Sequence, residues 1–155
     1  MLTAEVRYLV LALATLAAPA LAGSPVGFPQ GTWILDEAAS RPLAATSQAL
    51  EVISDDGQTL SFTLRKTDET KSAKALSWSG AYGGAPHLIE GSSIMFCVAY
   101  GPNGSIVISG SLAEGGKFQE KCHVAPSRRR FRCDGTLWSD GGKKRTYVEI
   151  YDLRR

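Results

Sequence analysis

The fold of this chain is decided by the segment GTWILD at residues 31–36. Within it, Trp33 and Leu35 alternate with the residues between them, and such a period of two is typical of a strand with one buried face. The same period continues through most of the sequence that follows. We therefore expect an all-β domain whose strands roll up over Trp33.

The first 22 residues have the pattern of a signal peptide. Arg7 precedes an apolar run at residues 8–18, and Ala20-Leu21-Ala22 follows as an A-x-A cleavage site. A membrane anchor is the alternative, but the run is shorter than the ~20 residues that a spanning helix needs, and Pro19 interrupts it. We expect a signal peptide at 1–22 and a mature protein at 23–155 that is periplasmic or secreted and does not span a membrane.

The composition is that of an ordinary globular protein. The chain has 155 residues, of which 44% are hydrophobic, and a formal net charge of +2. This excludes a disordered tail and a strongly basic nucleic-acid binder, so we expect no nucleic-acid partner. Residues 23–155 are enough for one domain with a single core.

Short strands with tight turns between them fill the mature sequence. The clearest hairpin is at 50–64, where Leu50 and Val52 lead into the turn at 55–57 and Phe62 follows on the return strand. Further strands are predicted at 76–78, 94–100, 106–108, 118–124, 129–137 and 145–153, and no helical pattern of any length interrupts them. About eight to ten such strands close most simply into an up-and-down antiparallel β-barrel. A two-sheet β-sandwich is the alternative, which periodicity does not separate from the barrel.

Three cysteines in an exported chain suggest one disulfide and one free thiol. Cys122 and Cys133 flank the turn at 125–127, and both are in register with the buried residues of their strands. We predict a Cys122–Cys133 disulfide, with two unpaired thiols as the alternative. Cys97 is expected to be an inert core residue.

The opening Gly31-x-Trp33 resembles the signature of lipocalins and other calycins, because it begins the first strand of an exported all-β chain. More closely, the segment at 31–36 with Ser40-Arg41 resembles a group of small exported bacterial lipocalin-like proteins of poorly defined function. The resemblance implies that Gly31 and Trp33 close one end of the barrel. It also implies a ligand in the interior.

One polar and aromatic cluster is a candidate ligand site. Trp78, Tyr82, His87 and Glu90 combine aromatic walls with a few orienting polar groups, and we expect them near the barrel mouth opposite Trp33. The histidines, His87 and His123, lack metal-ligand spacing, and His123 and Cys122 point to opposite faces of a strand. No catalytic triad, nucleophile elbow or cofactor motif is present, so we expect neither an enzyme nor a metal or cofactor.

Two functions of different classes remain. The first is an exported lipocalin-like barrel that binds a small hydrophobic or amphipathic ligand. The alternative is a module that binds another envelope protein, such as a protease or lysozyme inhibitor. A hollow interior favours the first, since small barrels can also be filled by their own side chains.

Overall fold

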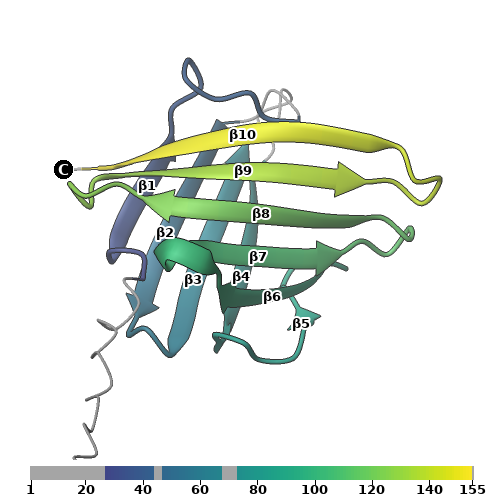
Figure 1. The fold of residues 1–155 in the computed structure, drawn as a ribbon, viewed down its shortest axis with the longest axis horizontal. Coiled ribbons are helices and arrows are strands. Elements are labelled where there is room, and N and C mark those ends of the chain that lie inside the picture. The colour runs from purple at the N-terminus through teal and green to yellow at the C-terminus, as the bar shows by residue number, and fades with distance from the viewer. Residues whose placement is uncertain (1–26, 44–46, 68–72, 155) are drawn as a thin grey trace, which may run out of the picture.

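The structure, a computed structural model, describes residues 27–43, 47–67 and 73–154. The predicted signal peptide lies outside these residues. Figure 1 shows the strands of the described chain, curved around a common interior. Their bounds are β1 Gly31–Leu35, β2 Ser47–Asp55, β3 Thr59–Thr67, β4 Ala73–Ala81, β5 His87–Leu88, β6 Met95–Tyr100, β7 Ile106–Ser111, β8 Lys117–Val124, β9 Arg130–Trp138 and β10 Lys144–Leu153.

The ten strands form one antiparallel sheet in the order β4-β3-β2-β1-β10-β9-β8-β7-β6-β5. Every neighbour in this order is also a neighbour in sequence except β1 and β10, where Trp33 pairs with Leu153. An up-and-down meander therefore closes by pairing its first strand with its last. The predicted all-β antiparallel class is confirmed.

The two edges of the sheet meet along a seam between β4 and the β5–β6 region. Ser77 and Glu90 exchange backbone hydrogen bonds of 3.2 and 2.8 Å, and the amide of Gly83 donates to the carbonyl of Val98 at 2.7 Å. The sheet is thus a nearly closed barrel, as predicted, and the sandwich is not formed. In Figure 1, β1–β4 cross behind β6–β10, which gives the barrel a front and a back wall.

The turns follow from local chemistry. In the β2–β3 turn, Asp56 accepts hydrogen bonds from the amides of Gln58 at 2.8 Å and Thr59 at 2.7 Å, while Gly57 has a φ of 81° that favours glycine. The turn between β6 and β7 also follows from its residues. Residues Pro102–Gly104 form a 3₁₀ turn with Asn103 in the left-handed region, because Pro102 favours its first position and asparagine tolerates a positive φ.

Trp33 is completely buried at one end of the barrel, which we call the floor end. Its indole Nε1 donates a hydrogen bond of 3.0 Å to the carbonyl of Pro29. Its ring packs edge-on against the ring of Phe131, with the two ring centroids 4.9 Å apart. The ring of Phe131 in turn packs against the rings of Phe28 and Tyr151, at centroid distances of 4.9 and 4.7 Å. These aromatic rings form a continuous floor.

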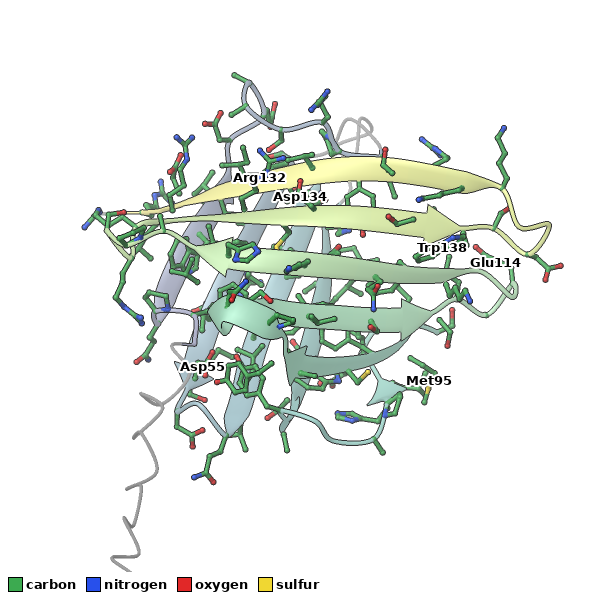
Figure 2. All side chains as sticks on the ribbon, in the orientation of Figure 1. Asp55, Met95, Glu114, Arg132, Asp134 and Trp138 are labelled. Atoms are coloured by element: carbon green, nitrogen blue, oxygen red, sulfur yellow. A yellow bond between two sulfur atoms is a disulfide. The ribbon has the colours of Figure 1, made fainter. Side chains whose placement is uncertain are left out.

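The opposite end of the barrel, the far end, carries the β7–β8 and β9–β10 turns. Figure 2 shows Asp55 at the floor end, with Glu114 and Trp138 at the far end.

The predicted disulfide between Cys122 and Cys133 is confirmed. The two residues lie directly opposite each other on β8 and β9, with a Cα–Cα distance of 4.0 Å. Both side chains are buried, because each lies on the inner face of its strand. Cys97 is the free cysteine of the described chain, and it is partly buried.

Candidate functional site

The barrel is hollow between its floor and its far end. It encloses a cavity of about 360 Å³. Most of the lining is apolar: Phe28, Leu43, Leu50, Val52, Leu60, Phe62, Leu64, Leu76, Ile89, Ile94, Phe96, Ile108, Leu112, Phe118, Phe131, Cys133 and Leu137. The interior is therefore not filled by its own side chains.

Both ends of the cavity are defined by the fold. At the floor end it rests on Phe28, Phe131 and Tyr151, the rings that pack around Trp33. Toward the far end it reaches Leu112 beside the β7–β8 turn and Leu137 near the end of β9. The cavity thus runs along the barrel and ends on the aromatic floor.

A group of polar side chains interrupts the apolar lining, and we call it the polar belt. Alternation along each strand places these side chains on the inner face, in line with apolar neighbours. The belt crosses from β3 and β2 to β10 and β8. Its members are Gln48, Lys66, Glu120, Tyr147, Glu149 and Tyr151.

Two of these residues meet across an intervening strand. The hydroxyl of Tyr147 on β10 donates to Oε1 of Glu120 on β8 at 2.6 Å. Gly135 on β9 lies opposite both residues. A Cβ at position 135 would lie 2.2 Å from the Tyr147 ring, so the contact requires glycine there.

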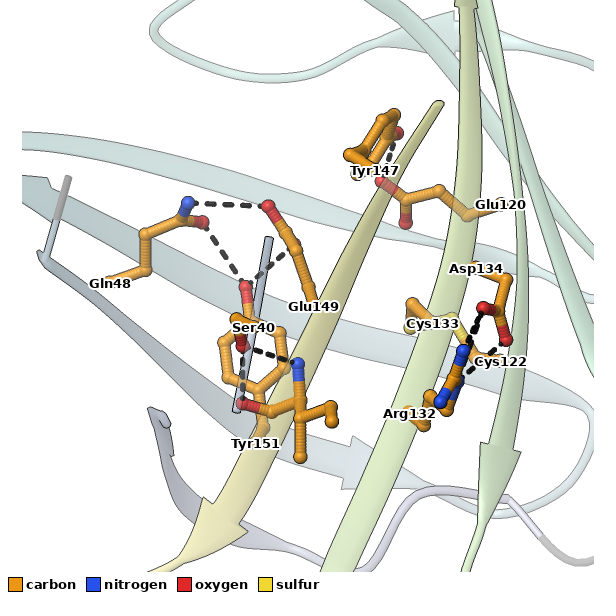
Figure 3. The surroundings of a disulfide bond; sticks show 11 residues. Ser40, Gln48, Glu120, Cys122, Arg132, Cys133, Asp134, Tyr147, Glu149 and Tyr151 are labelled. Atoms are coloured by element: carbon orange, nitrogen blue, oxygen red, sulfur yellow. Dashed lines mark hydrogen bonds and ion pairs between the residues drawn. A yellow bond between two sulfur atoms is a disulfide. The ribbon is translucent and has the colours of Figure 1, made fainter. Parts of the chain in front are cut away.

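Gln48, Glu149 and Tyr151 form the second part of the belt (Figure 3). Glu149 accepts hydrogen bonds from the Gln48 amide nitrogen at 3.3 Å and from the Tyr151 hydroxyl at 2.9 Å. The Tyr151 hydroxyl also lies 3.1 Å from the Gln48 amide oxygen. A phenol has one proton, so it donates to one of these two oxygens at a time.

The environment of Glu120 changes its acidity. Burial raises the pKa of the Glu120 carboxyl to about 7, and the negative charge of Glu149 acts in the same direction. The hydrogen bond from Tyr147 and the ammonium of Lys66 lower the pKa. Burial and the charge of Glu120 raise the pKa of Tyr147 far above its usual range, so Tyr147 remains a hydrogen-bond donor.

The cysteines beside Glu120 do not make a metal site. Ligand atoms of Glu120, Cys122 and Cys133 lie within 4.8 Å of one another. Both sulfurs are committed to the disulfide, so neither supplies the thiolate that a metal needs.

On the outer face of β9, Arg132 and Asp134 form an exposed ion pair at 2.6 Å.

The residues predicted to bind ligand lie outside the cavity lining. Trp78 is buried and stacks on His87, with ring centroids 4.9 Å apart, and its indole Nε1 has no hydrogen-bond partner among the described residues. His87 is exposed, and its Nε2 lies 2.9 Å from the carbonyl oxygen of Ser79. Glu90 is exposed and joins the seam through its backbone. The structure brings Trp78 and His87 together, and the binding role of the set stays a prediction.

Tyr82 lies at the floor end, not at the end opposite Trp33. Its hydroxyl donates to Oδ2 of Asp55 at 2.7 Å, and the amide of Phe28 donates to the same oxygen at 2.7 Å. Its ring stacks on Tyr100 at 4.1 Å. The expected position was wrong because β4 runs toward the floor end, so the residue after it follows the strand there.

Sequence reasoning missed the polar belt, although the signal was present. Glu120 lies between Phe118 and Cys122 in the same period of two that assigned those two residues to the inner face. Glu149 lies in the same way between Tyr147 and Tyr151. A carboxylate at an inward position of a strand is itself a sign of a cavity, because a packed core excludes a charge.

Comparison with known proteins supports the fold alone. No family model matches the chain, and no curated protein matches it. Among solved structures, the wild-type fluorescent protein UnaG superposes with a TM-score of 0.53 and 14% identity, over 81% of this chain and 96% of UnaG. A mutant of UnaG gives a TM-score of 0.54 at the same identity and coverage. The chain is therefore similar in fold to UnaG over most of the length of both chains.

A membrane-spanning helix is not found in the described ranges. None of the helical residues there forms a segment of the length and apolar character that a span requires.

Proposed function

We propose that this protein binds a small ligand with an apolar body inside its barrel. The observation that carries the proposal is the cavity of about 360 Å³ with a largely apolar lining and one polar belt. Ligand sites in proteins have volumes of about 300 to 1,000 Å³, apolar walls and a few polar groups that fix orientation. Similarity in fold to UnaG is consistent with this use of the barrel.

The proposal extends to an exported, lipocalin-like protein without catalytic activity. The pattern of the first 22 residues and the Cys122–Cys133 disulfide support export, since disulfides persist in oxidising compartments. N-terminal sequencing of the protein from the cell envelope should begin at Gly23. A chain that retains Met1 in the cytoplasm would contradict export.

The binding proposal is tested with 1-octanol, a neutral ligand small enough for the cavity. The cavity of about 360 Å³ lies within the range of about 300 to 1,000 Å³ for small-molecule sites, and octanol, with roughly nine non-hydrogen atoms, is a small ligand for such a site. Isothermal titration calorimetry should detect one octanol per chain. Native mass spectrometry of protein isolated from its source should show a bound small molecule.

A cavity-filling variant tests whether octanol binds inside the barrel cavity. Leu64→Trp places a larger ring in the lining and should weaken octanol binding at least tenfold, and Ile94→Trp is a second variant if the first does not fold. Ile53→Trp is the matched control, because Ile53 is 47% exposed on the outside of β2. Octanol binding that survives both cavity variants would place the ligand elsewhere and contradict the proposal.

A further inference from the structure

The charged side chains that face the cavity leave it with excess negative charge. Among the described residues of the lining, Glu120 and Glu149 oppose one ammonium group, that of Lys66. The net charge is therefore −1 when both carboxyls are ionised and zero when Glu120 is protonated. Unbalanced charge in a largely apolar cavity costs far more than in water, so a charged ligand has to match this excess.

The polar belt also offers acceptors more readily than donors. An ionised carboxylate accepts hydrogen bonds at about four lone-pair positions and donates none. The hydroxyl of Tyr147 already donates its hydrogen bond to Glu120, and the hydroxyl of Tyr151 donates to an oxygen of Glu149 or Gln48. Lys66 is the cationic donor of the belt, and a ligand group that meets the carboxylates of Glu120 and Glu149 has to bring its own N–H or O–H protons.

We propose that the cavity takes a protonated amine with an apolar chain or ring, its ammonium group against the carboxylates of Glu120 and Glu149. This inference rests on the proposed ligand-binding function and names the ligand class. The ammonium brings the cavity to neutrality with both glutamates ionised, and the apolar body lies against the leucine, isoleucine and phenylalanine side chains. A carboxylate ligand, by contrast, would increase the negative charge or require protonation of a glutamate.

The charge match links binding to pH. An ammonium ion favours ionised Glu120, whose pKa is about 7 in the free protein, so binding releases a proton from it. The ionised fraction of such a group rises about tenfold from pH 6 to pH 8. The other titratable groups that face Glu120 are Tyr147 and Glu149 from β10 and Lys66 from β3. The affinity for an amine should therefore rise about tenfold over this range.

The test compares three ligands with the same chain, octylammonium, 1-octanol and octanoate, by calorimetry on the purified protein at pH 6, 7 and 8. At pH 8 octylammonium should bind roughly tenfold tighter than octanol, because its hydrogen bonds to carboxylates are charge-assisted, and octanoate should bind most weakly. Octanoate as the tightest ligand, or octylammonium no tighter than octanol, would overturn the inference while octanol binding upholds the proposed function. If none of the three binds, both fail.

Variants of the polar belt test whether its carboxylates cause the preference for octylammonium. Glu120→Gln keeps the size and hydrogen-bonding capacity of the side chain but removes its charge, so octylammonium should lose its preference over octanol and its pH dependence. Glu149→Gln is the second variant and should weaken octylammonium in the same direction. Glu51→Gln is the matched control, since Glu51 lies on the outer face of β2 with its side chain 49% exposed. An octylammonium affinity unchanged by both belt variants would overturn the inference.

Discussion

Tyr147 on β10 and Glu120 on β8 are hydrogen-bonded at 2.6 Å although β9 separates their strands. The phenol ring lies over Gly135, which is opposite both residues and has no side chain to block the path. A single glycine therefore lets the Glu120 carboxyl and the Tyr147 phenol meet at the cavity. The sequence signal is an isolated glycine within a strand, which often marks a close approach.

Gly135→Ala should lower the free energy of unfolding by about 1 to 3 kcal/mol, as overpacked sites do. The reason is that the added methyl group would lie 2.2 Å from the Tyr147 ring. Urea unfolding followed by tryptophan fluorescence measures the change. Gly141→Ala is the control, because a Cβ there meets nothing within 4 Å, and it should change stability by under about 0.5 kcal/mol. Equal effects of the two substitutions would contradict the crowding.

Stability should fall as pH rises from 5 to 8 because of Glu120. Its pKa rises from 4.5 in the unfolded chain to about 7 in the folded protein, so the folded state binds more protons between these values. The free energy of unfolding then decreases with pH, by up to about 3 kcal/mol for a shift of this size. Denaturant midpoints at pH 5, 6, 7 and 8 measure the slope. Glu120→Gln should flatten it, and an identical slope in the variant would assign the dependence to other groups.

Trp33→Ala should cost about 3 to 5 kcal/mol, the range for large aromatic side chains removed from a core. Trp33 is 0% exposed, and its ring packs edge-on against Phe131 in the barrel floor. Thermal and urea unfolding measure the loss. Trp138→Ala removes the same side chain from a partly exposed position at the far end and should cost roughly 1 kcal/mol. A loss below about 1 kcal/mol at Trp33 would mean that the floor does not depend on it.

Thiol counting in denaturant should find one free thiol per chain without reductant and three with it. The free thiol is Cys97, since Cys122 and Cys133 are bonded to each other. Reduction should lower the free energy of unfolding by about 2 to 3 kcal/mol, as expected for a short closed loop. Three reactive thiols before reduction would refute the bridge.

Much of the fold was accessible from sequence because its determinants are local. The hairpin at 50–64 has a period of two on both arms and a turn whose aspartate and glycine fit the geometry. The disulfide followed from the inward register of Cys122 and Cys133. The pairing of β1 with β10 joins residues more than a hundred positions apart, so only the need to hide sheet edges pointed to it.

The candidate site was less accessible, because a cavity is a property of packing and not of any one strand. Trp78 and Tyr82 are aromatic residues near polar ones in the sequence, but Trp78 packs against Phe62 and Phe96, and the Tyr82 hydroxyl donates a hydrogen bond to Asp55. Sequence alternation assigns a side chain to the inner face without saying whether its neighbours fill the space. The inward-facing glutamates are the local sign that neighbouring side chains do not fill the interior.

The seam between β4 and the β5–β6 region is joined differently from the rest of the barrel wall. Elsewhere continuous ladders join adjacent strands, whereas the described residues of the seam share three backbone hydrogen bonds, at Ser77, Glu90 and Gly83. Aromatic side chains fill the space between these edges, where the ring of Trp78 on β4 lies 4.9 Å from the rings of Phe96 on β6 and His87 on β5, centroid to centroid. Side-chain packing, and not a backbone ladder, therefore completes the wall of the barrel along this line.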